Sequence, residues 1–279
     1  MSVLVVGSLH LDVVLRARHL PQLDETVTGT GVDYVFGGKG GNQARAAARM
    51  GARVAFAGRA GSDQFGDMLR AGLAGIDTSQ LQRDTGPSGM SAAIVNDAGD
   101  YGAVIVSAAN LNIDTNAIDI PQSTKLVLLQ NEIPETVNAA IAAKAQMAGA
   151  QVWLNAAPAR PLSDALAASV DLLVVNRVEA DFYAGDDRFG RVLTTLGANG
   201  VSYDGQRCPA PKVDVVSTHG AGDMFMGALA ARCAAGHSVK DALPFAQAAA
   251  ALLVAADGPA RDTLDAARVA QFLATHPRL

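Results

Sequence analysis

Short, mostly apolar runs alternate with helix-forming segments along most of the chain, and no other feature constrains the fold as strongly. The runs span only four or five residues each and lie at 3–6, 54–57, 125–129, 151–154, 172–175 and 192–195. Apolar strands separated by helices are typical of parallel strands that are buried on both faces. The alternation therefore predicts an α/β fold built around a mostly parallel central sheet.

Composition narrows the class of protein. The chain has 279 residues, of which 49% are hydrophobic and 18% are charged, a balance typical of one enzyme domain spanning 1–279. The net charge of −5 and the lack of a Lys/Arg run argue against nucleic acid or an anionic membrane as a partner. No apolar stretch reaches the ~20 residues of a membrane-spanning helix. Cys208 and Cys233 lack metal-ligand spacing and are too few for a disulfide framework, which favours a cytoplasmic location.

A glycine-rich turn at 218–223, with the sequence Thr-His-Gly-Ala-Gly-Asp, precedes a strongly helical segment. The first N–H groups of a helix lack intrahelical partners, and Gly220, Ala221 and Gly222 leave space for an anion to approach them. Asp223 would repel a phosphate unless it faced a hydroxyl whose proton it could accept. This pairing indicates phosphoryl transfer with Asp223 as the base. An ordinary N-cap Asp after a glycine-rich turn explains the same residues.

A second glycine-rich segment, Gly-Gly-Lys-Gly-Gly-Asn-Gln at 37–43, precedes the helix-forming residues 44–50. It matches neither the Walker pattern nor G-x-G-x-x-G, which argues against a P-loop and against a Rossmann dinucleotide site. Because glycine has no Cβ atom, the donors of Lys39 and Asn42 could approach a small polar molecule such as a sugar. The alternative is a flexible turn before a surface helix.

Polar residues follow several of the predicted strands, at the edge where open α/β sheets bind ligands. Asp12, Glu132 and Asn176 each come shortly after an apolar run. Asn176 and Glu179 could together order the water shell of a Mg²⁺ ion. The same pair, with Glu three residues after Asn, is also the signature of a helix N-terminal capping box.

The segment 13–36 alternates irregularly without a helical period, which predicts exposed antiparallel strands. Two further runs, 91–95 and 102–107, flank the turn-forming residues Asn-Asp-Ala-Gly-Asp at 96–100 and predict a β-hairpin. We expect these parts to pair in a small sheet, formed by about 13–36 and 89–107, that projects from the main body.

These residues resemble the ribokinase-like (PfkB) carbohydrate kinases over nearly the whole chain. The specific parts of the resemblance are Gly7-Ser8 with Asp12, the segment 37–43, Glu132, the segment 155–159, Asn176 with Glu179, Thr195-Leu196-Gly197, and Gly220-Ala221-Gly222-Asp223. Two glycine-rich signatures at the expected separation are far more specific than either one alone. The resemblance implies a three-layer α/β sandwich with a small β-sheet lid that covers a sugar and often forms a dimer contact.

The resemblance also implies a role for each matched residue. It implies that the sugar contacts Asp12, Gly38, Lys39, Asn42 and Glu132. It implies that Asp223 is the catalytic base and that the backbone of Gly220, Ala221 and Gly222 forms an anion hole. It implies that Asn176, Thr195, Gly197 and Gly200 lie near ATP, with Gln247 as a looser match near the adenine. Asn176 and Glu179 would serve the region of Mg²⁺ and the phosphates.

Three departures from the family pattern affect these implications. Ser217 stands where the family usually has an acid associated with an activating monovalent-cation site, so activation by K⁺ is in question. The segment 180–191 is shorter than the helix and strand that the family has there, which would remodel the nucleotide side. Gly41 replaces the usual Ala beside the sugar loop.

The resemblance leads us to expect a kinase that uses ATP and Mg²⁺ to phosphorylate a primary hydroxyl of a sugar, converting D-ribose to ribose 5-phosphate, and that forms a homodimer through the lid. Another pentose, a hexose or a nucleoside is the alternative acceptor. A catalytically weak sugar- or nucleotide-binding protein of the same fold is the alternative of a different class, motivated by Ser217 and the short 180–191 segment. The missing dinucleotide fingerprint argues against an oxidoreductase.

Overall fold

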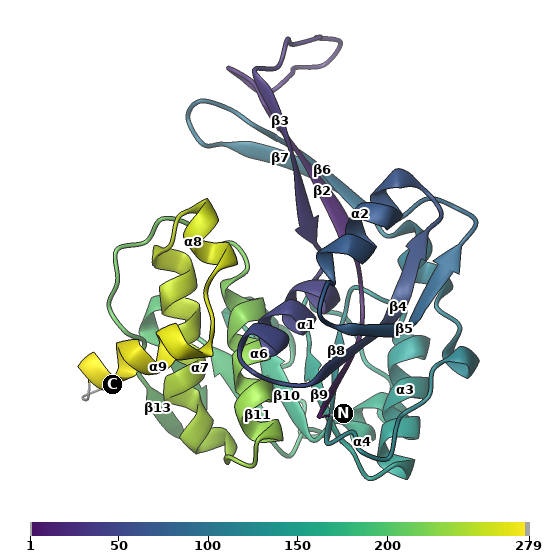
Figure 1. The fold of residues 1–279 in the computed structure, drawn as a ribbon, viewed down its shortest axis with the longest axis vertical. Coiled ribbons are helices and arrows are strands. Elements are labelled where there is room, and N and C mark those ends of the chain that lie inside the picture. The colour runs from purple at the N-terminus through teal and green to yellow at the C-terminus, as the bar shows by residue number, and fades with distance from the viewer. Residues whose placement is uncertain (1, 277–279) are drawn as a thin grey trace.

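A nine-stranded, mostly parallel sheet forms the centre of the molecule in the computed structural model, which describes residues 2–276 (Figure 1). From one edge to the other its strands are β13 (Gln206–Cys208), β12 (Val201–Tyr203), β11 (Val192–Thr195), β10 (Leu172–Val175), β9 (Gln151–Asn155), β8 (Leu126–Gln130), β1 (Val3–Val6), β4 (Val54–Gly61) and β5 (Asp77–Asp84). The strands from β11 to β5 run parallel, and β12 and β13 form an antiparallel hairpin at one edge. The predicted α/β class and mostly parallel sheet are confirmed.

Helices cover both faces of this sheet, because alternate residues of each buried strand point to opposite sides. In β1, Val3 and Val5 belong to one buried hydrophobic cluster, and Leu4 and Val6 belong to the other. The first cluster is covered by α1 (Lys39–Arg49), α2 (Gln64–Gly72), α6 (Ala221–Ala234), α7 (Val239–Ala255) and α9 (Ala266–Thr275). The second is covered by α3 (Glu135–Met147), α4 (Asp164–Ser169) and α5 (Arg177–Phe182). The result is a three-layer sandwich (Figure 1).

A second sheet, of four strands, projects from one end of the sandwich (Figure 1). Its strands, in spatial order, are β3 (Gly31–Gly37), β2 (His10–Arg16), β6 (Met90–Val95) and β7 (Tyr101–Val106), and we call it the lid sheet. β2 is antiparallel to β3 and parallel to β6, and β6 and β7 form a hairpin closed by a bond from Asn96 N to Asp100 O (3.0 Å). The pairing of β2 with β6 joins two distant parts of the chain in one sheet.

The start of α1 differs from the prediction. The helix begins at Lys39 rather than at 44, so Gly40 and Gly41 lie inside it, and Gly38 is the N-cap with a φ of 87°. A Cβ on Gly40 would lie 2.6 Å from the backbone N of Ser8. Glycine is therefore needed here for the first turn of α1 to pack directly on the chain that leaves β1.

Three other elements also differ from the prediction. β4 continues to Gly61, into residues predicted as a loop. β2 already begins at His10, so Asp12 lies in a strand of the lid sheet instead of a loop. The strand β5 is not predicted, because its polar sequence Asp-Thr-Ser-Gln-Leu-Gln-Arg-Asp lacks the apolar pattern of a buried strand. An edge strand tolerates such a sequence, since one side and much of each face meet water.

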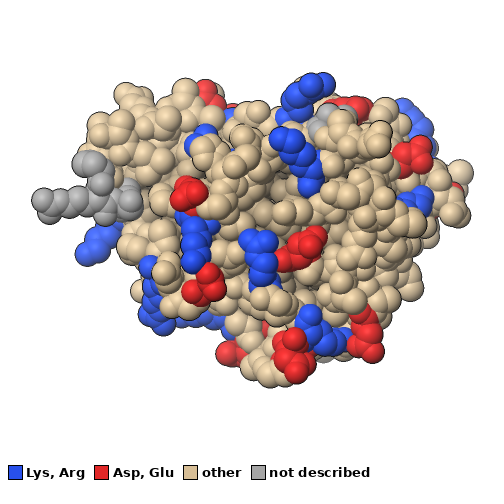
Figure 2. Space-filling view, turned by 90° about the horizontal axis from the view of Figure 1, so that it is seen from below, with Lys and Arg blue, Asp and Glu red and all other residues tan. Residues whose placement is uncertain are grey.

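Charged residues of both signs are interspersed on the end of the molecule away from the lid sheet (Figure 2). Surface ion pairs are present in the molecule, such as that between Lys240 and Asp204 (2.7 Å). Among the described helices, none combines the length and the apolar character that crossing a bilayer requires.

Candidate active site

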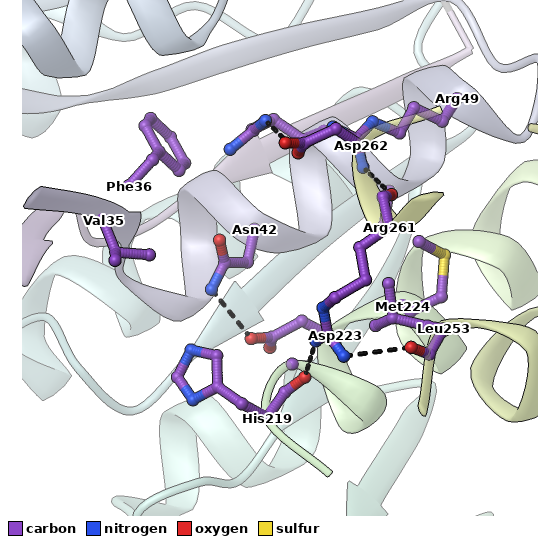
Figure 3. Close-up of a pocket in the computed structure, with 13 residues that line it drawn as sticks. Val35, Phe36, Asn42, Arg49, His219, Asp223, Met224, Leu253, Arg261 and Asp262 are labelled. Carbon is purple, nitrogen blue, oxygen red and sulfur yellow. Dashed lines mark hydrogen bonds and ion pairs between the residues drawn. The ribbon is translucent and has the colours of Figure 1, made fainter. Parts of the chain in front are cut away.

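Asp223 lies in the first turn of α6 and is only 9% exposed. Its carboxylate accepts hydrogen bonds from Asn42 Nδ2 (3.3 Å) and Gln43 Nε2 (3.0 Å), so it faces α1 (Figure 3). The N-cap of α6 is Gly220, whose φ of 73° suits glycine, and the N-cap interpretation of Asp223 is therefore wrong. Burial raises the pKa of Asp223, while the charge of Lys39 and the amide donors act in the opposite direction.

Gln43 connects Asp223 to the ends of two central strands. Its Nε2 also donates to Oδ1 of Asn155 (3.0 Å), the last residue of β9, and its Oε1 accepts from Nε2 of Gln130 (2.9 Å), the last residue of β8. Gln43 and Gln130 are fully buried. Because a broken hydrogen bond would leave a buried polar atom unsatisfied, such a chain of amides resists rotation. The chain therefore holds the Asp223 carboxylate at a defined place relative to the sheet.

The close packing of α1 against α6 makes these contacts possible. A Cβ on Gly227 of α6 would lie 2.4 Å from the Cβ of Ala46 and 2.5 Å from the backbone N of Ala47. Small residues at a crossing let two helix axes approach. Asn42 lies one turn before Ala46, and Asp223 lies one turn before Gly227, so the crossing brings the two polar side chains together.

Glu132 follows β8 and receives donors from two other segments. Its Oε2 accepts hydrogen bonds from Ser8 Oγ (2.6 Å) and from the backbone N–H of Lys39 (2.8 Å), and His10 Nδ1 lies 3.8 Å from the same oxygen. Burial lowers the pKa of His10, against the attraction of Glu132 and Asp12, so the ring is neutral at neutral pH. The carboxylate is therefore held by neutral donors at the end of β1 and the start of α1.

Two cavities open beside these residues. The larger, of about 520 Å³, is lined by Lys39 and Glu132 and by Ile105 of the lid sheet. The smaller, of about 150 Å³, is lined by Asn42 and Asp223 (Figure 3). Lys39 and Asn42 are three residues apart and neighbours on one side of α1. The first turn of α1 therefore contributes one residue to each cavity. The predicted sugar ligand Glu132 lines the larger cavity, and the predicted base Asp223 lines the smaller.

Asp12 lies on the face of the lid sheet that turns toward the cavities. The register puts Asp12 beside Val35 and Ser91, and Ser91 beside Ile105, so these side chains share one face. Val35 lines the smaller cavity and Ile105 the larger. Asp12 Oδ1 accepts a 2.5 Å hydrogen bond from Ser91 Oγ, and a Cβ on Gly37 would lie 2.2 Å from Oδ2. Asp12 itself is not among the described residues that line either cavity.

Asn176 and Glu179 form the N-terminal capping box of α5. Asn176 Oδ1 accepts from Glu179 N (3.0 Å), and the Glu179 carboxylate accepts from Asn176 N (2.7 Å) and Nδ2 (2.9 Å). The capping interpretation is confirmed. Burial raises the pKa of Glu179, and the residue also lines the larger cavity. A carboxylate has about four lone-pair sites, so the cap leaves acceptor capacity that a ligand in the cavity can use.

The other residues predicted near ATP lie around the β11–β12 turn. Thr195 Oγ1 donates to the oxygen of Val175 (3.3 Å), and Gly197 begins a single 3₁₀ turn (Gly197–Asn199). Gly200 has a φ of 85°, and a Cβ there would lie 2.0 Å from the oxygen of Cys208. Thr195, Gly197 and Gly200 are not among the described residues that line the two cavities.

Gln247 and Ser217 help to anchor the segment between β13 and α6. The buried Gln247 amide donates to the oxygens of Cys208 (2.9 Å) and Pro209 (3.0 Å), so both of its N–H groups face the backbone at the start of this segment. At the other end, the oxygen of Ser217 accepts a hydrogen bond from Arg261 Nη1 (3.2 Å). In the structure, the amide of Gln247, a residue predicted to lie near the adenine, therefore anchors the backbone that follows β13.

Comparison with known proteins identifies the family. The sequence pattern described as pfkB family carbohydrate kinase matches residues 1–266. The chain belongs to this family. It is 34% identical over 275 residues to the ribokinase of Bacillus subtilis (strain 168). The matched region covers 92% of this chain and 94% of that protein. The pfkB kinase is therefore a phosphotransferase with an alcohol group as acceptor.

Solved structures share the fold along nearly the whole pfkB kinase. The ribokinase of Thermotoga maritima matches with a TM-score of 0.90 at 27% identity, covering 98% of this chain and 99% of that chain. The Arabidopsis thaliana ribokinase complexed with ribose and ATP matches with a TM-score of 0.87 at 27% identity, covering 98% of each chain. The predicted ribokinase-like sandwich is confirmed.

Three amides of the pfkB kinase, the buried Gln43 and Gln130 and the partly buried Asn155, contribute to the site although the sequence analysis assigns none of them a role of its own. Gln43, Gln130 and Asn155 form the hydrogen-bonded chain that ends on Asp223. A sequence signal for two of them exists, because Gln130 and Asn155 are the polar last residues of otherwise apolar strands. Such residues lie at the ligand-binding edge of a parallel sheet.

Proposed function

We propose that this pfkB kinase transfers the γ-phosphate of ATP to the primary hydroxyl of D-ribose and forms ribose 5-phosphate. The observation that carries the proposal is the buried carboxylate of Asp223, whose pKa is raised by burial, next to the first N–H groups of α6. Such a carboxylate suits a general base beside an anion. The choice of ribose is supported by the 34% identical relative, a ribokinase, and by the Arabidopsis ribokinase that contains ribose and ATP.

We assign the sugar to the space between α1, the lid sheet and the start of α6. Asp12 and Glu132 supply carboxylate acceptors for sugar hydroxyls, and Lys39 and Asn42 supply donors. Gly38 lets the ligand approach the backbone at the N-terminus of α1. A sugar hydroxyl both donates and accepts, so a mixed set of this kind can satisfy several hydroxyls at once.

The transfer itself uses Asp223 and the backbone beside it. Asp223 accepts the proton of the primary hydroxyl while the hydroxyl oxygen attacks the γ-phosphorus in line and the bond to the leaving ADP breaks. The N–H groups of Gly220, Ala221 and Gly222 stabilise the charge on the transferred group. Gln43 keeps the carboxylate pointed at the hydroxyl.

We place the nucleotide along Asn176, Thr195, Gly197 and Gly200, at the carboxyl ends of β10 and β11. The residues fit a hydrated Mg²⁺, because Glu179 lines the larger cavity with lone pairs that its cap leaves free. The described chain contains no group of three or more His, Cys, Asp or Glu able to hold a metal, so the ion would take its other oxygens from ATP and water. When bound with ATP, Mg²⁺ would neutralise negative charge on the phosphate oxygens.

An ADP-release assay with MgATP and a panel of D-ribose, 2-deoxy-D-ribose, D-fructose and adenosine tests the proposal. We expect the highest kcat/KM for D-ribose, with the phosphate on the primary hydroxyl by ³¹P NMR. A clearly better acceptor in the panel would replace ribose as the substrate. Sugar binding by calorimetry with no ADP release for any acceptor would instead support a binding protein of this fold.

The kcat of the enzyme is expected to fall as the pH is lowered, with an inflection above the ordinary range of an aspartate. The base must be deprotonated to accept a proton, and burial raises the pKa of Asp223 from its ordinary value of 3.8. Activity is therefore complete above the raised pKa and is lost as the pH falls through it. We would measure kcat against pH at saturating ribose and MgATP. A kcat that stays constant down to about pH 4 would contradict the assignment of the base.

We propose that two copies of the chain associate through their lid sheets. The register puts Leu15, Val32, Tyr34 and Val104 on the face opposite to Asp12. Tyr34 is 53% exposed and Val104 is 66% exposed. An exposed apolar face on a thin sheet with two free edges is typical of an interaction surface. A second copy would cover the same face on both partners.

Val104→Lys is expected to convert a dimer to a monomer, because a buried, unpaired ammonium opposes association. Light scattering after size exclusion measures the mass. Met147→Lys is the matched control, since Met147 is 81% exposed on α3 of the main body, and this variant should remain dimeric. A wild type that is monomeric at all concentrations would disprove the lid interface.

A further inference from the structure

The guanidinium group of Arg261, in α8 (Gly258–Asp262), donates hydrogen bonds to three backbone carbonyl groups. Figure 3 draws those of His219 and Leu253. Nη1 reaches the oxygens of Ser217 (3.2 Å) and Leu253 (2.9 Å), and Nη2 reaches the oxygen of His219. Burial lowers the pKa of Arg261, but the ordinary pKa of a guanidinium is so high that the group stays charged at neutral pH. A full positive charge therefore lies among neutral carbonyl dipoles.

These carbonyl groups come from the loop that precedes α6 and from the last turn of α7. Two backbone bonds join the same segments, because the N–H groups of Val216 (2.8 Å) and Ser217 (3.1 Å) both donate to the oxygen of Val254. Arg261 extends this junction toward α6 by two further contacts on the loop. The loop that leads into the proposed anion hole is thus attached to α7 through Arg261.

The contact with His219 determines the direction of the Gly220 N–H group. The carbonyl of His219 and the N–H of Gly220 belong to one planar trans peptide, in which they point in opposite directions. Because Arg261 holds the oxygen, the N–H of Gly220 points away from the guanidinium. Gly220 is the first residue of the proposed anion hole, so Arg261 orients a phosphate donor that it does not itself provide.

We infer that Arg261 is a positioning residue that serves the loop before α6 as a built-in cation, in place of an exchangeable monovalent ion. Carbonyl oxygens are the ligands that K⁺ takes in exchange for its hydration shell, and here guanidinium hydrogens occupy three of them. Ser217 adds a hydroxyl and no negative charge, so a second cation beside Arg261 would be repelled. The residues at this place therefore do not fit a bound monovalent cation. The inference rests on the proposed function, in which this loop binds the transferred phosphate.

Arg261→Ala is expected to lower kcat about 10- to 100-fold in a buffer whose only monovalent cation is tetramethylammonium, with little change in the KM for ribose. The loss should be smaller than the roughly 10²- to 10³-fold cost of deleting an anion-hole donor, because the donor stays in place but is less well oriented. KCl should restore several-fold of the lost kcat in this variant, since the freed carbonyl oxygens can bind K⁺. The kcat of the wild type should be the same with KCl as with tetramethylammonium chloride.

Two further substitutions separate charge from hydrogen bonding and serve if Arg261→Ala does not fold. Arg261→Lys keeps a cation and should retain more activity without K⁺ than Arg261→Gln, which keeps donors without charge. Arg268→Ala is the matched control, because Arg268 is an exposed arginine of the neighbouring helix α9, and it should behave as the wild type in both salts.

The melting temperature supplies a readout that needs no kinase activity. K⁺ should raise the melting temperature of Arg261→Ala, relative to tetramethylammonium, and leave that of the wild type unchanged. If no sugar is phosphorylated, the proposed function fails while this comparison still decides whether Arg261 fills a cation site. Wild-type activation by K⁺, unchanged kcat in Arg261→Ala, or no effect of K⁺ on the variant's melting temperature would each overturn the inference.

Discussion

Asp223→Asn is expected to lower kcat by a factor of roughly 10² or more at saturating ribose and MgATP, the range for losing a general base. Asn keeps the shape of the side chain but only one of the two oxygens. Asn42 donates to Oδ2 (3.3 Å) and Gln43 to Oδ1 (3.0 Å), so one of these two donors keeps its acceptor. Asn cannot accept the hydroxyl proton. Because that interaction is made only in the transition state, the KM for ribose should change far less than kcat. Steady-state kinetics by ADP release measures both constants.

Asp67→Asn is the control for this substitution, because Asp67 is an exposed acid in the first turn of another helix, α2. Its kinetics should match the wild type. Calorimetry on Asp223→Asn should still detect ribose and ATP. Turnover near that of the wild type would remove Asp223 as the base, and a loss of ribose binding would assign it to site assembly instead of proton transfer.

Gly227→Ala is expected to destabilise the fold by about 2 kcal/mol, within the range for inserting a methyl group into a packed core. The new Cβ would lie 2.4 Å from Ala46 Cβ and 2.5 Å from Ala47 N, so α1 and α6 must move apart. For a domain of this size the melting temperature should fall by roughly 5 °C. The kcat should fall as well, since the same movement separates Asn42 from Asp223.

Gly190→Ala is the matched control, because Gly190 has open space around the position of a Cβ and an ordinary φ. Thermal unfolding and ADP-release kinetics of both variants would be compared with the wild type. If Gly227→Ala unfolds at the wild-type temperature with unchanged kcat, the close crossing of α1 and α6 does not hold the site together.

Much of the fold follows from local pattern. Val3–Val6, Leu172–Val175 and the other short apolar runs become central strands because a run buried on both faces needs no alternation. The strand Asp77–Asp84 could not be predicted in this way, since an edge strand can be polar throughout. The start of α1 at Lys39 could not be predicted from local sequence either. A run of glycines predicts a turn, and only the segment that packs against them shows that they belong to a helix.

The candidate site likewise has a part that local sequence predicts and a part that depends on tertiary packing. Asp223, Lys39, Asn42 and Glu132 are predicted from sequence because each stands in a short motif whose chemistry is local. The motifs are a base after a proposed anion-binding turn, donors between glycines, and an acid at a strand end. Their relation to one another is not local. Gln43 and Asp223 are 180 positions apart and meet only because Gly227 lets two helices cross closely.

The sequence by itself determined the strand and helix alternation, the family resemblance and the identity of the proposed base, because periodicity and motif chemistry act over a few residues. Only the tertiary structure decided that Arg261 holds carbonyl groups of the segment that precedes α6, and that Asp223 is a buried carboxylate instead of a cap. Burial, pKa and the direction of a peptide group depend on atoms from distant parts of the chain. They therefore become defined only when packing brings those parts together.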